Sequence, residues 1–294
     1  MGTHPARVRK SLSTQEDLRQ HREHCSVAAG ALDAVGIAAG QQVRVKRSDD
    51  VYALYTVSEA RPQDGDGVVR MGLTGRQRLD CDDEFDAELD SQVVHPSMSD
   101  DEAEANGEFI ERLYDDGAHT GLIAIAPHGG DIEDRTDDQA QRVASRLADA
   151  VPVSVWLCKG YQARGAKKTW HITSTDIDPA SFPQLHSIFS RGFSDAVAFH
   201  GFDRAEILVG GMAAPALKEQ IAAEIIKVIA GSGISVRIAC PDDVFGGDDP
   251  ANIVNRLTAG GSNGVQIEQS LVARNTHWDD IAEAVAKVYR SRLL

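Results

Sequence analysis

The sequence contains no long hydrophobic run. No stretch of about 18 consecutive apolar residues, the length that spans a bilayer as a helix, occurs in the 294 residues. The N-terminal 20 residues are basic, but they lack the apolar core of a secretory signal. We therefore expect a cytoplasmic protein with no membrane partner.

Cysteine is scarce, and positive charge is outweighed by negative charge. The four cysteines are scattered without a CxxC pair, which supports neither a zinc ribbon nor a disulfide framework, so we expect free, buried thiols. Lys and Arg number 30 against 45 Asp and Glu, which gives a formal net charge of -15. Because phosphate contacts require clustered Lys and Arg, this balance argues against nucleic acid as the main partner. Such an acidic surface is also expected in a salt-adapted organism.

Residues 1–100 predict an N-terminal helix and a small β-rich accessory domain. Ser13 and Glu16 form a capping box, and the apolar spacing after them predicts a helix over residues 13–34. Alternating runs between turns predict strands at 42–46, 51–57, 68–73, 77–79 and 85–94. So many short strands are typical of a small barrel, and the amino-acid sequence of this region loosely resembles those of double-psi barrels. An accessory domain without chemistry is the simplest interpretation.

Residues 101–294 predict a second domain in which short apolar runs alternate with helical patterns. An acidic segment at 96–106 is interpreted as a linker or as the entry to a helix that reaches Tyr114. Strands are then predicted at 121–127, 153–158, 195–200, 206–210, 233–239 and 264–269, and helices at 134–150, 179–191, 213–230 and 276–291. This alternation predicts an α/β fold with a mixed, largely parallel sheet and helices on both faces. Ligands of such sheets bind beyond the carboxyl ends of the strands.

Two of these predicted strands end in the same way, with a histidine followed by glycine. They place His128 and His200 on the same edge of one sheet, and Glu133 follows the Gly-Gly turn after the first of them. A lone histidine at a strand end is more often a structural residue, so it is the repetition that favours ligands. Two imidazoles and a carboxylate with one open position are a known catalytic zinc arrangement. We predict that His128, Glu133 and His200 bind Zn²⁺.

The predicted strand at 264–269 adds a further carboxylate near this edge. Gln266 and Glu268 share one face of it by the two-residue period. Glu268 could take a proton from a metal-activated water and return it to the leaving amine, or it could be an ordinary surface carboxylate. Asn255 is a candidate substrate-binding residue beside Arg256, a candidate catalytic residue. Arg256 could bind a substrate carboxylate or could equally be a surface charge at a helix end.

A dense cationic segment stands out in this acidic chain. Arg164, Lys167 and Lys168 lie close together after the strand at 153–158. The contrast with the rest of the chain suggests that they bind an anionic ligand, although a charge run is often only solvated. His171 follows them and could contact substrate, or could equally be a packing histidine.

Five separated motifs occur in order between residues 121 and 294: APHGGDIE (126–133), WHITST (170–175), FHG (199–201), VGG (209–211) and GVQIEQSLVAR (264–274). Together they resemble the poly-γ-glutamate hydrolase family. The resemblance implies a fold similar to the zinc carboxypeptidases, one Zn²⁺ held by His128, Glu133 and His200, and Glu268 as general base. It also implies endo-type cleavage of γ-glutamyl amide bonds. The digestive carboxypeptidases use a shorter HxxE spacing, so the wider spacing here fits the poly-γ-glutamate branch better. Residues 1–100 are not covered by the resemblance.

The sequence thus predicts a zinc-dependent hydrolase that cleaves γ-glutamyl amide bonds in poly-γ-glutamate or a related acidic peptide. One alternative is a zinc hydrolase of another amide or of an aminoacyl ester, although a tRNA substrate is disfavoured because no broad basic face is evident. A second alternative is a non-catalytic binding protein on the same fold, against which the intact candidate residues argue. Nothing in the sequence indicates an oligomeric state.

Overall fold

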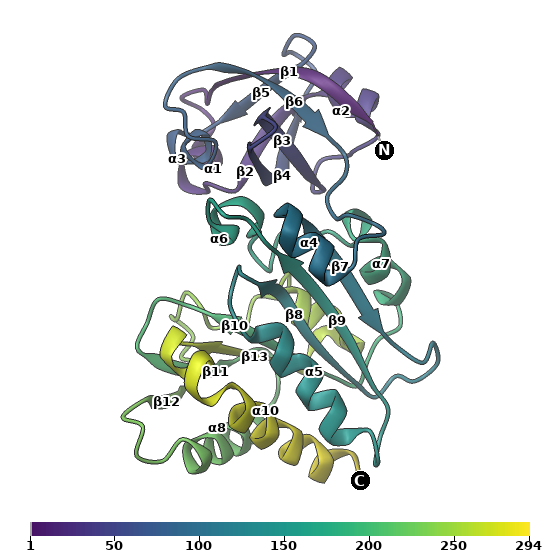
Figure 1. The fold of residues 1–294 in the computed structure, drawn as a ribbon, viewed down its shortest axis with the longest axis vertical. Helices are drawn as coiled ribbons and strands as arrows, with labels where there is room; N and C mark the ends of the chain where they lie inside the picture. The colour runs from purple at the N-terminus through teal and green to yellow at the C-terminus, as the bar shows by residue number, and fades with distance from the viewer. Residues whose placement is uncertain (1) are drawn as a thin grey trace. The chain divides into compact units, whose positions relative to one another are not determined.

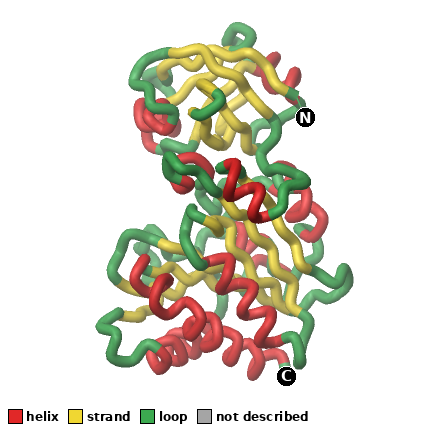
Figure 2. The backbone as a smooth tube through the Cα atoms, in the orientation of Figure 1, coloured by secondary structure: helices red, strands yellow, loops and turns green. Residues whose placement is uncertain are grey.

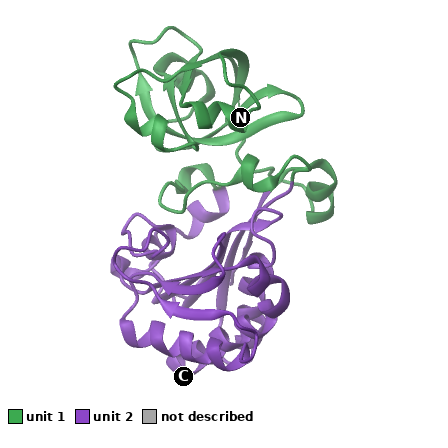
Figure 3. Cartoon of the chain, turned by 90° about the vertical axis from the view of Figure 1, so that its left-hand side faces the viewer, with its two compact units in different colours: residues 1–109, 162–182 green, residues 110–161, 183–294 purple. Residues whose placement is uncertain are grey.

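The computed structural model describes residues 2–294, and the chain divides into two compact units (Figure 3). Unit 1 comprises the chain up to Phe109 together with Gln162–Phe182, and unit 2 comprises Ile110–Tyr161 and Pro183–Leu294. The sequence predicted a single division near residue 100. In the structure, residues 101–109 and the later segment Gln162–Phe182 also pack with unit 1.

Unit 1 contains a closed six-stranded barrel with the strand order β1-β5-β2-β4-β3-β6 (Figure 1). The pairs β1/β5 and β2/β4 are parallel, and the other neighbouring pairs are antiparallel. The apolar side chains of alternating strand positions fill its interior, among them Val8, Val27, Val45 and Leu89. The elements of unit 1 are β1 (Thr3–Lys10), α1 (Glu16–Gln20), β2 (His24–Ala28), α2 (Ala29–Val35), β3 (Gln42–Ser48), β4 (Val51–Arg61), β5 (Val68–Met71), α3 (Leu73–Arg78), β6 (Phe85–Asp90), α4 (Asp100–Asn106), α6 (Ala166–Trp170) and the 3-10 helix η1 (Pro179–Ser181).

The predicted barrel is confirmed, but the predicted helix over residues 13–34 is wrong. Strand β2 interrupts it between the short helices α1 and α2, because residues 24–28 hydrogen-bond to β4 and β5 inside the barrel. Residues 77–79 were predicted as a strand and instead end helix α3, and β1 was not predicted. All four cysteines are free, and two of them, Cys25 and Cys158, are buried.

The segment Gln162–Phe182 is tied to the barrel by a buried arginine. The guanidinium of Arg78 donates to the carbonyl oxygen of Lys168 at 2.8 Å and to those of Thr169 and His171 at 3.2 Å. It also donates to the carbonyl of Leu54 in strand β4. One charged side chain therefore satisfies carbonyl groups of the barrel and of a segment that is distant in sequence.

Unit 2 contains a seven-stranded sheet with the order β12-β11-β13-β10-β8-β9-β7 (Figures 1 and 2). The pairs β8/β9, β8/β10, β10/β13 and β11/β12 are parallel, and β11/β13 is antiparallel. The elements of unit 2 are β7 (Phe109–Tyr114), β8 (Leu122–Gly130), α5 (Thr136–Leu147), β9 (Val153–Gly160), α7 (Pro183–Ile188), β10 (Asp195–Gly201), β11 (Glu206–Gly210), α8 (Pro215–Val228), β12 (Ser235–Ile238), α9 (Ile253–Arg256), the 3-10 helix η2 (Ala259–Gly261), β13 (Gly264–Gln269) and α10 (Leu271–Leu293).

Helices α5, α8 and α10 cover one face of this sheet (Figure 1). Their apolar side chains form one core with alternate residues of the strands, such as Ala124 and Ala126 of β8 and Val265 and Ile267 of β13. On the opposite face, Asn252 at the start of α9 contacts Gln266 of β13. Strand β8 is buried on both faces, which is why its sequence is a continuous apolar run.

The predicted mixed α/β fold with a separate barrel is confirmed. The six predicted strands and the predicted helices of the second domain correspond to β8 to β13 and to α5, α7, α8 and α10. The predicted helix reaching Tyr114 is wrong, because it ends at Asn106 and residues 109–114 form strand β7. Within residues 2–294, no helix is long and apolar enough to cross a bilayer.

Candidate metal centre

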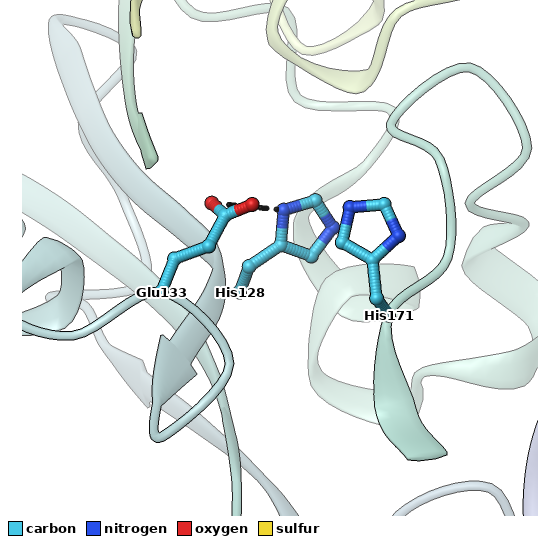
Figure 4. A group of neighbouring side chains, drawn as sticks. All are labelled: His128, Glu133 and His171. Carbon is cyan, nitrogen blue, oxygen red and sulfur yellow. Dashed lines mark hydrogen bonds and ion pairs between the residues drawn. The ribbon is translucent and has the colours of Figure 1, made fainter. Parts of the chain in front are cut away.

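The candidate metal centre lies where β8 and β10 end side by side. These two strands are parallel neighbours, so His128 near the end of β8 and His200 near the end of β10 are carried to the same edge of the sheet. Glu133 follows β8 in the turn that leads to α5. Figure 4 shows its carboxylate turned toward the imidazole of His128. All three side chains are buried.

Three potential ligand atoms converge at this point. The Nδ1 atom of His128 lies 3.2 Å from Nδ1 of His200 and 3.3 Å from Oε2 of Glu133. The third side of the triangle, from His200 Nδ1 to Glu133 Oε2, is 3.4 Å. Tetrahedral ligands that are about 2.0–2.1 Å from a zinc ion lie about 3.3–3.4 Å from one another. The donor set and its spacing therefore fit one zinc ion.

The turn between His128 and Glu133 requires its two glycines. A Cβ atom on Gly129 would lie 2.7 Å from Cβ of Asp137 and 2.9 Å from the carbonyl oxygen of Cys158, while Gly130 has φ = 65°. The turn is closed by the backbone N–H of Glu133, which donates to the carbonyl of His128 at 2.9 Å. The backbone conformation of this turn thus fixes where the side chain of Glu133 lies relative to that of His128.

The carboxylate of Glu133 is held in its ionised form. Burial alone would raise its pKa, but the imidazoles of His128 and His200 hold the pKa well below its ordinary value. The backbone N–H of Gly201 also donates to Oε2 of Glu133 at 2.9 Å. An ionised carboxylate fixed in this way is a preformed ligand for a cation.

Glu268 is brought to the same edge of the sheet by strand β13. It is the register partner of His200 in the parallel pair β10/β13, and it is buried. The side chain of Gln266, on the same face of β13, donates from Nε2 to Oε1 of Glu268 at 3.0 Å. Glu268 therefore lies beside the three potential ligands, on the strand next to that of His200.

Asn255 and Arg256 belong to α9. The side chain of Asn255 is buried and binds backbone groups, because Nδ2 donates to the carbonyls of Gly247 and Asp249 and Oδ1 accepts from the N–H of Met212. The guanidinium of Arg256 lies 4.8 Å from the centre of the Phe189 ring. Substrate binding by Asn255 and catalysis by Arg256 stay predictions.

The four candidate substrate-binding residues of the segment 162–182 belong to unit 1. Arg164 and Lys168 both form ion pairs with Asp80 there. His171, which Figure 4 also draws, donates from Nδ1 to Oε1 of the Glu23 carboxylate at 2.7 Å. Lys167 lies in helix α6. Substrate binding by Arg164, Lys167, Lys168 and His171 stays a prediction.

Comparison with known proteins identifies the family. A family model for poly-γ-glutamate hydrolase matches residues 97–290. This chain belongs to the poly-γ-glutamate hydrolase family. The family match includes the whole candidate metal centre and Glu268, and it leaves out all six strands of the barrel.

Individual relatives of this family member match parts of its length. The SPbeta prophage-derived UPF0714 protein YoqZ of Bacillus subtilis (strain 168) is 29% identical over 155 residues, which are 52% of this chain and 50% of that protein. The chain thus matches about half the length of this relative. The structure of a bacteriophage poly-γ-glutamate hydrolase is 28% identical, with a TM-score of 0.49 and coverage of 62% of this chain and 89% of the other. A zinc-free structure named YNDL-apo is 20% identical, with a TM-score of 0.49 and coverage of 66% and 96%.

Arg274, in the first turn of α10, is a residue of this poly-γ-glutamate hydrolase family member that was not predicted from the sequence. Its buried guanidinium donates to the carbonyl of Asp134, next to Glu133, at 2.7 Å. It also lies against Gly201, where an added Cβ would be 2.4 Å from its Cζ atom. Arg274 thus contacts both segments that carry potential ligands. Its place at the end of the 264–274 motif was the available signal.

Proposed function

We propose that this protein is a zinc-dependent hydrolase that cleaves the γ-glutamyl amide bonds of poly-γ-glutamate. The observation that carries the proposal is the triangle of His128 Nδ1, Glu133 Oε2 and His200 Nδ1, whose sides of 3.2–3.4 Å match three ligands of one zinc ion. Membership in the poly-γ-glutamate hydrolase family supports the substrate. The seven-stranded sheet with a ligand set at its strand ends supports a zinc carboxypeptidase-like fold.

In this mechanism His128, Glu133 and His200 hold the zinc ion. A zinc ion in such a site supplies Lewis acidity, which polarises a carbonyl group and lowers the pKa of water to about 7. Glu268 lies beside these residues on β13, so its carboxylate takes the proton of the attacking water and returns it to the leaving amine. Arg256 stabilises the negative charge that develops on the carbonyl oxygen.

The remaining predicted residues bind the polymer. Poly-γ-glutamate carries one carboxylate on every residue, and Arg164, Lys167 and Lys168 bind these carboxylates by charge-assisted hydrogen bonds. His171 and Asn255 complete the set of proposed substrate-binding residues. We also propose that the protein acts in the cytoplasm.

Chain-length analysis of poly-γ-glutamate tests the proposed function. The polymer is incubated with the protein, with the protein after chelation, and with the chelated protein after zinc is restored. We expect shortening in the first and third samples only, and none with His128→Ala, because that variant lacks one of the three ligands. Shortening that survives chelation would contradict zinc dependence, and unchanged polymer in every sample would contradict the substrate.

A further inference from the structure

We propose that Gln266 is a positioning residue for Glu268 and that Asn252 fixes the direction in which Gln266 acts. The inference rests on the proposed function, because it concerns the carboxylate that transfers the proton. Gln266, Glu268 and Asn252 are buried and lie in unit 2. Their side chains form one hydrogen-bonded chain that begins at the backbone of helix α9.

A backbone N–H group decides which atom donates and which accepts in each of these side-chain hydrogen bonds. Asn252 is the N-cap of α9, and its Oδ1 atom accepts from the N–H of Val254 at 3.1 Å. A backbone N–H can only donate, so the other end of the Asn252 amide must be Nδ2. This Nδ2 donates to Oε1 of Gln266 at 2.8 Å. Gln266 therefore has to present its own Nε2 on the opposite side.

That Nε2 group faces two acceptors. It donates to Oε1 of Glu268 at 3.0 Å and to the carbonyl oxygen of Phe245 at 3.3 Å. The terminal torsion of a glutamate is broad, so an unrestrained Glu268 carboxylate would sample many orientations. The bond from Gln266 favours the orientations in which Oε1 faces Nε2, and the strand register makes His200 the neighbour of Glu268 across the β10/β13 pair.

The loop between β12 and α9 is shaped to hold Gln266. Gly247 has φ = 68°, and a Cβ atom at this position would lie 2.7 Å from Cβ of Gln266. Only a residue without a side chain allows the loop to approach so closely in this conformation. Asn255 fixes the same loop through the carbonyls of Gly247 and Asp249. The loop, the cap of α9 and Gln266 thus act together on the orientation of Glu268.

Two substitutions remove different hydrogen bonds of this side-chain network. Gln266→Met keeps the length of the side chain and removes the donor to Glu268. Asn252→Ser keeps an oxygen for the cap of α9 and removes Nδ2. The helix therefore retains its cap, but no donor fixes which end of the Gln266 amide faces Glu268. The matched control is Gln184→Met, which removes an amide that donates to the carbonyl of Glu111, away from Glu268.

Steady-state kinetics with poly-γ-glutamate provide the test. We expect kcat to fall about tenfold in Gln266→Met and in Asn252→Ser, which is less than the about 10²–10⁴-fold contribution of a general base. KM and zinc content should stay unchanged, and Gln184→Met should keep the wild-type kcat. In a Glu268→Gln background, Gln266→Met should cause no further loss, since its effect acts through Glu268. An unchanged kcat, or an equal loss in the Glu268→Gln background, would overturn the proposal.

A second readout separates this inference from the proposed function. The side-chain amide protons of Gln266 are followed by NMR in the wild-type protein, in Glu268→Gln and in Asn252→Ser. We expect both substitutions to shift the Gln266 signals, whether or not the protein cleaves poly-γ-glutamate, because Glu268→Gln replaces the charged acceptor of Nε2 with a neutral amide oxygen and Asn252→Ser removes the donor to Oε1. Failure of the wild type to cleave the polymer together with these shifts would count against the proposed function alone. Unshifted signals would overturn the positioning role.

Discussion

Glu268 lies on the strand next to that of His200 and is not one of the three potential ligands, so its role can be separated from metal binding. His128, Glu133 and His200 form the triangle of donor atoms, whereas Glu268 lies beside His200 across the β10/β13 pair and accepts from Gln266. Removal of a ligand and removal of the proposed base should therefore have different consequences for bound zinc.

We predict that Glu268→Gln retains zinc and loses activity. The substitution keeps the size of the side chain and removes only the ability to take a proton, so kcat should fall by about 10²–10⁴-fold while metal content stays at the wild-type level. The control is Glu283→Gln on the exposed face of α10, where the carboxylate pairs with Arg146. Elemental analysis and initial rates on poly-γ-glutamate measure both quantities. A Glu268→Gln protein with wild-type kcat would remove this residue from the mechanism.

At the level of elements, the strand ends that carry the candidate ligands could be predicted because their signals are local. An apolar run followed by His and Gly marks the end of a buried strand within a few residues, and this holds for His128 and for His200. Gln266 could also have been predicted as a partner of Glu268, because the two-residue period places both on one face. Asn252 could not, since its role depends on a contact between α9 and β13.

Strand β2 shows why other elements could not be predicted. Its residues, 24–28, follow a capping pattern at Ser13 and Glu16 and continue an apolar spacing that suits a helix. They become a strand because β4 and β5 hydrogen-bond to both sides of them, and those partners lie about 30 or more residues later in the chain. Tertiary pairing overrides the local pattern at this point.

The same strand supports a prediction about pH and stability. Burial lowers the pKa of His24, but hydrogen bonds to Asp176 and Asp17, both at 2.8 Å, raise it from the ordinary 6.5 of a histidine to about 9. Because the folded pKa is raised, the protonated form stabilises the fold below about pH 6.5, and this stabilisation is lost as the pH rises through about 9. His21 stacks on the same ring.

We therefore expect His24→Gln to weaken the pH dependence of unfolding between pH 6 and pH 10. The wild type should lose on the order of 1–2 kcal/mol more than the variant over this range, after allowance for partial exposure of the ion pairs. Urea unfolding at both pH values, followed by a probe in unit 1, measures the difference. Identical pH dependence in the two proteins would contradict a stabilising charge on His24.

At the scale of the whole molecule, the chain order of the two units differs from a simple succession of domains. Composition changes near residues 96–106 suggested one boundary, but the chain returns to unit 1 at Gln162–Phe182. This return depends on contacts such as those of Arg78 with the carbonyls of Lys168 and His171, which have no local sequence signal. The cationic segment was visible in the sequence, but its pairing with Asp80 was not.

We propose that two imidazoles and one carboxylate of unit 2 hold a single zinc ion. The most direct measurement is anomalous X-ray diffraction at the zinc edge from crystals of the protein grown with zinc. We expect one peak per chain within bonding distance, about 2.0–2.2 Å, of His128 Nδ1, Glu133 Oε2 and His200 Nδ1. A peak at another set of residues, or no peak in zinc-grown crystals, would contradict it.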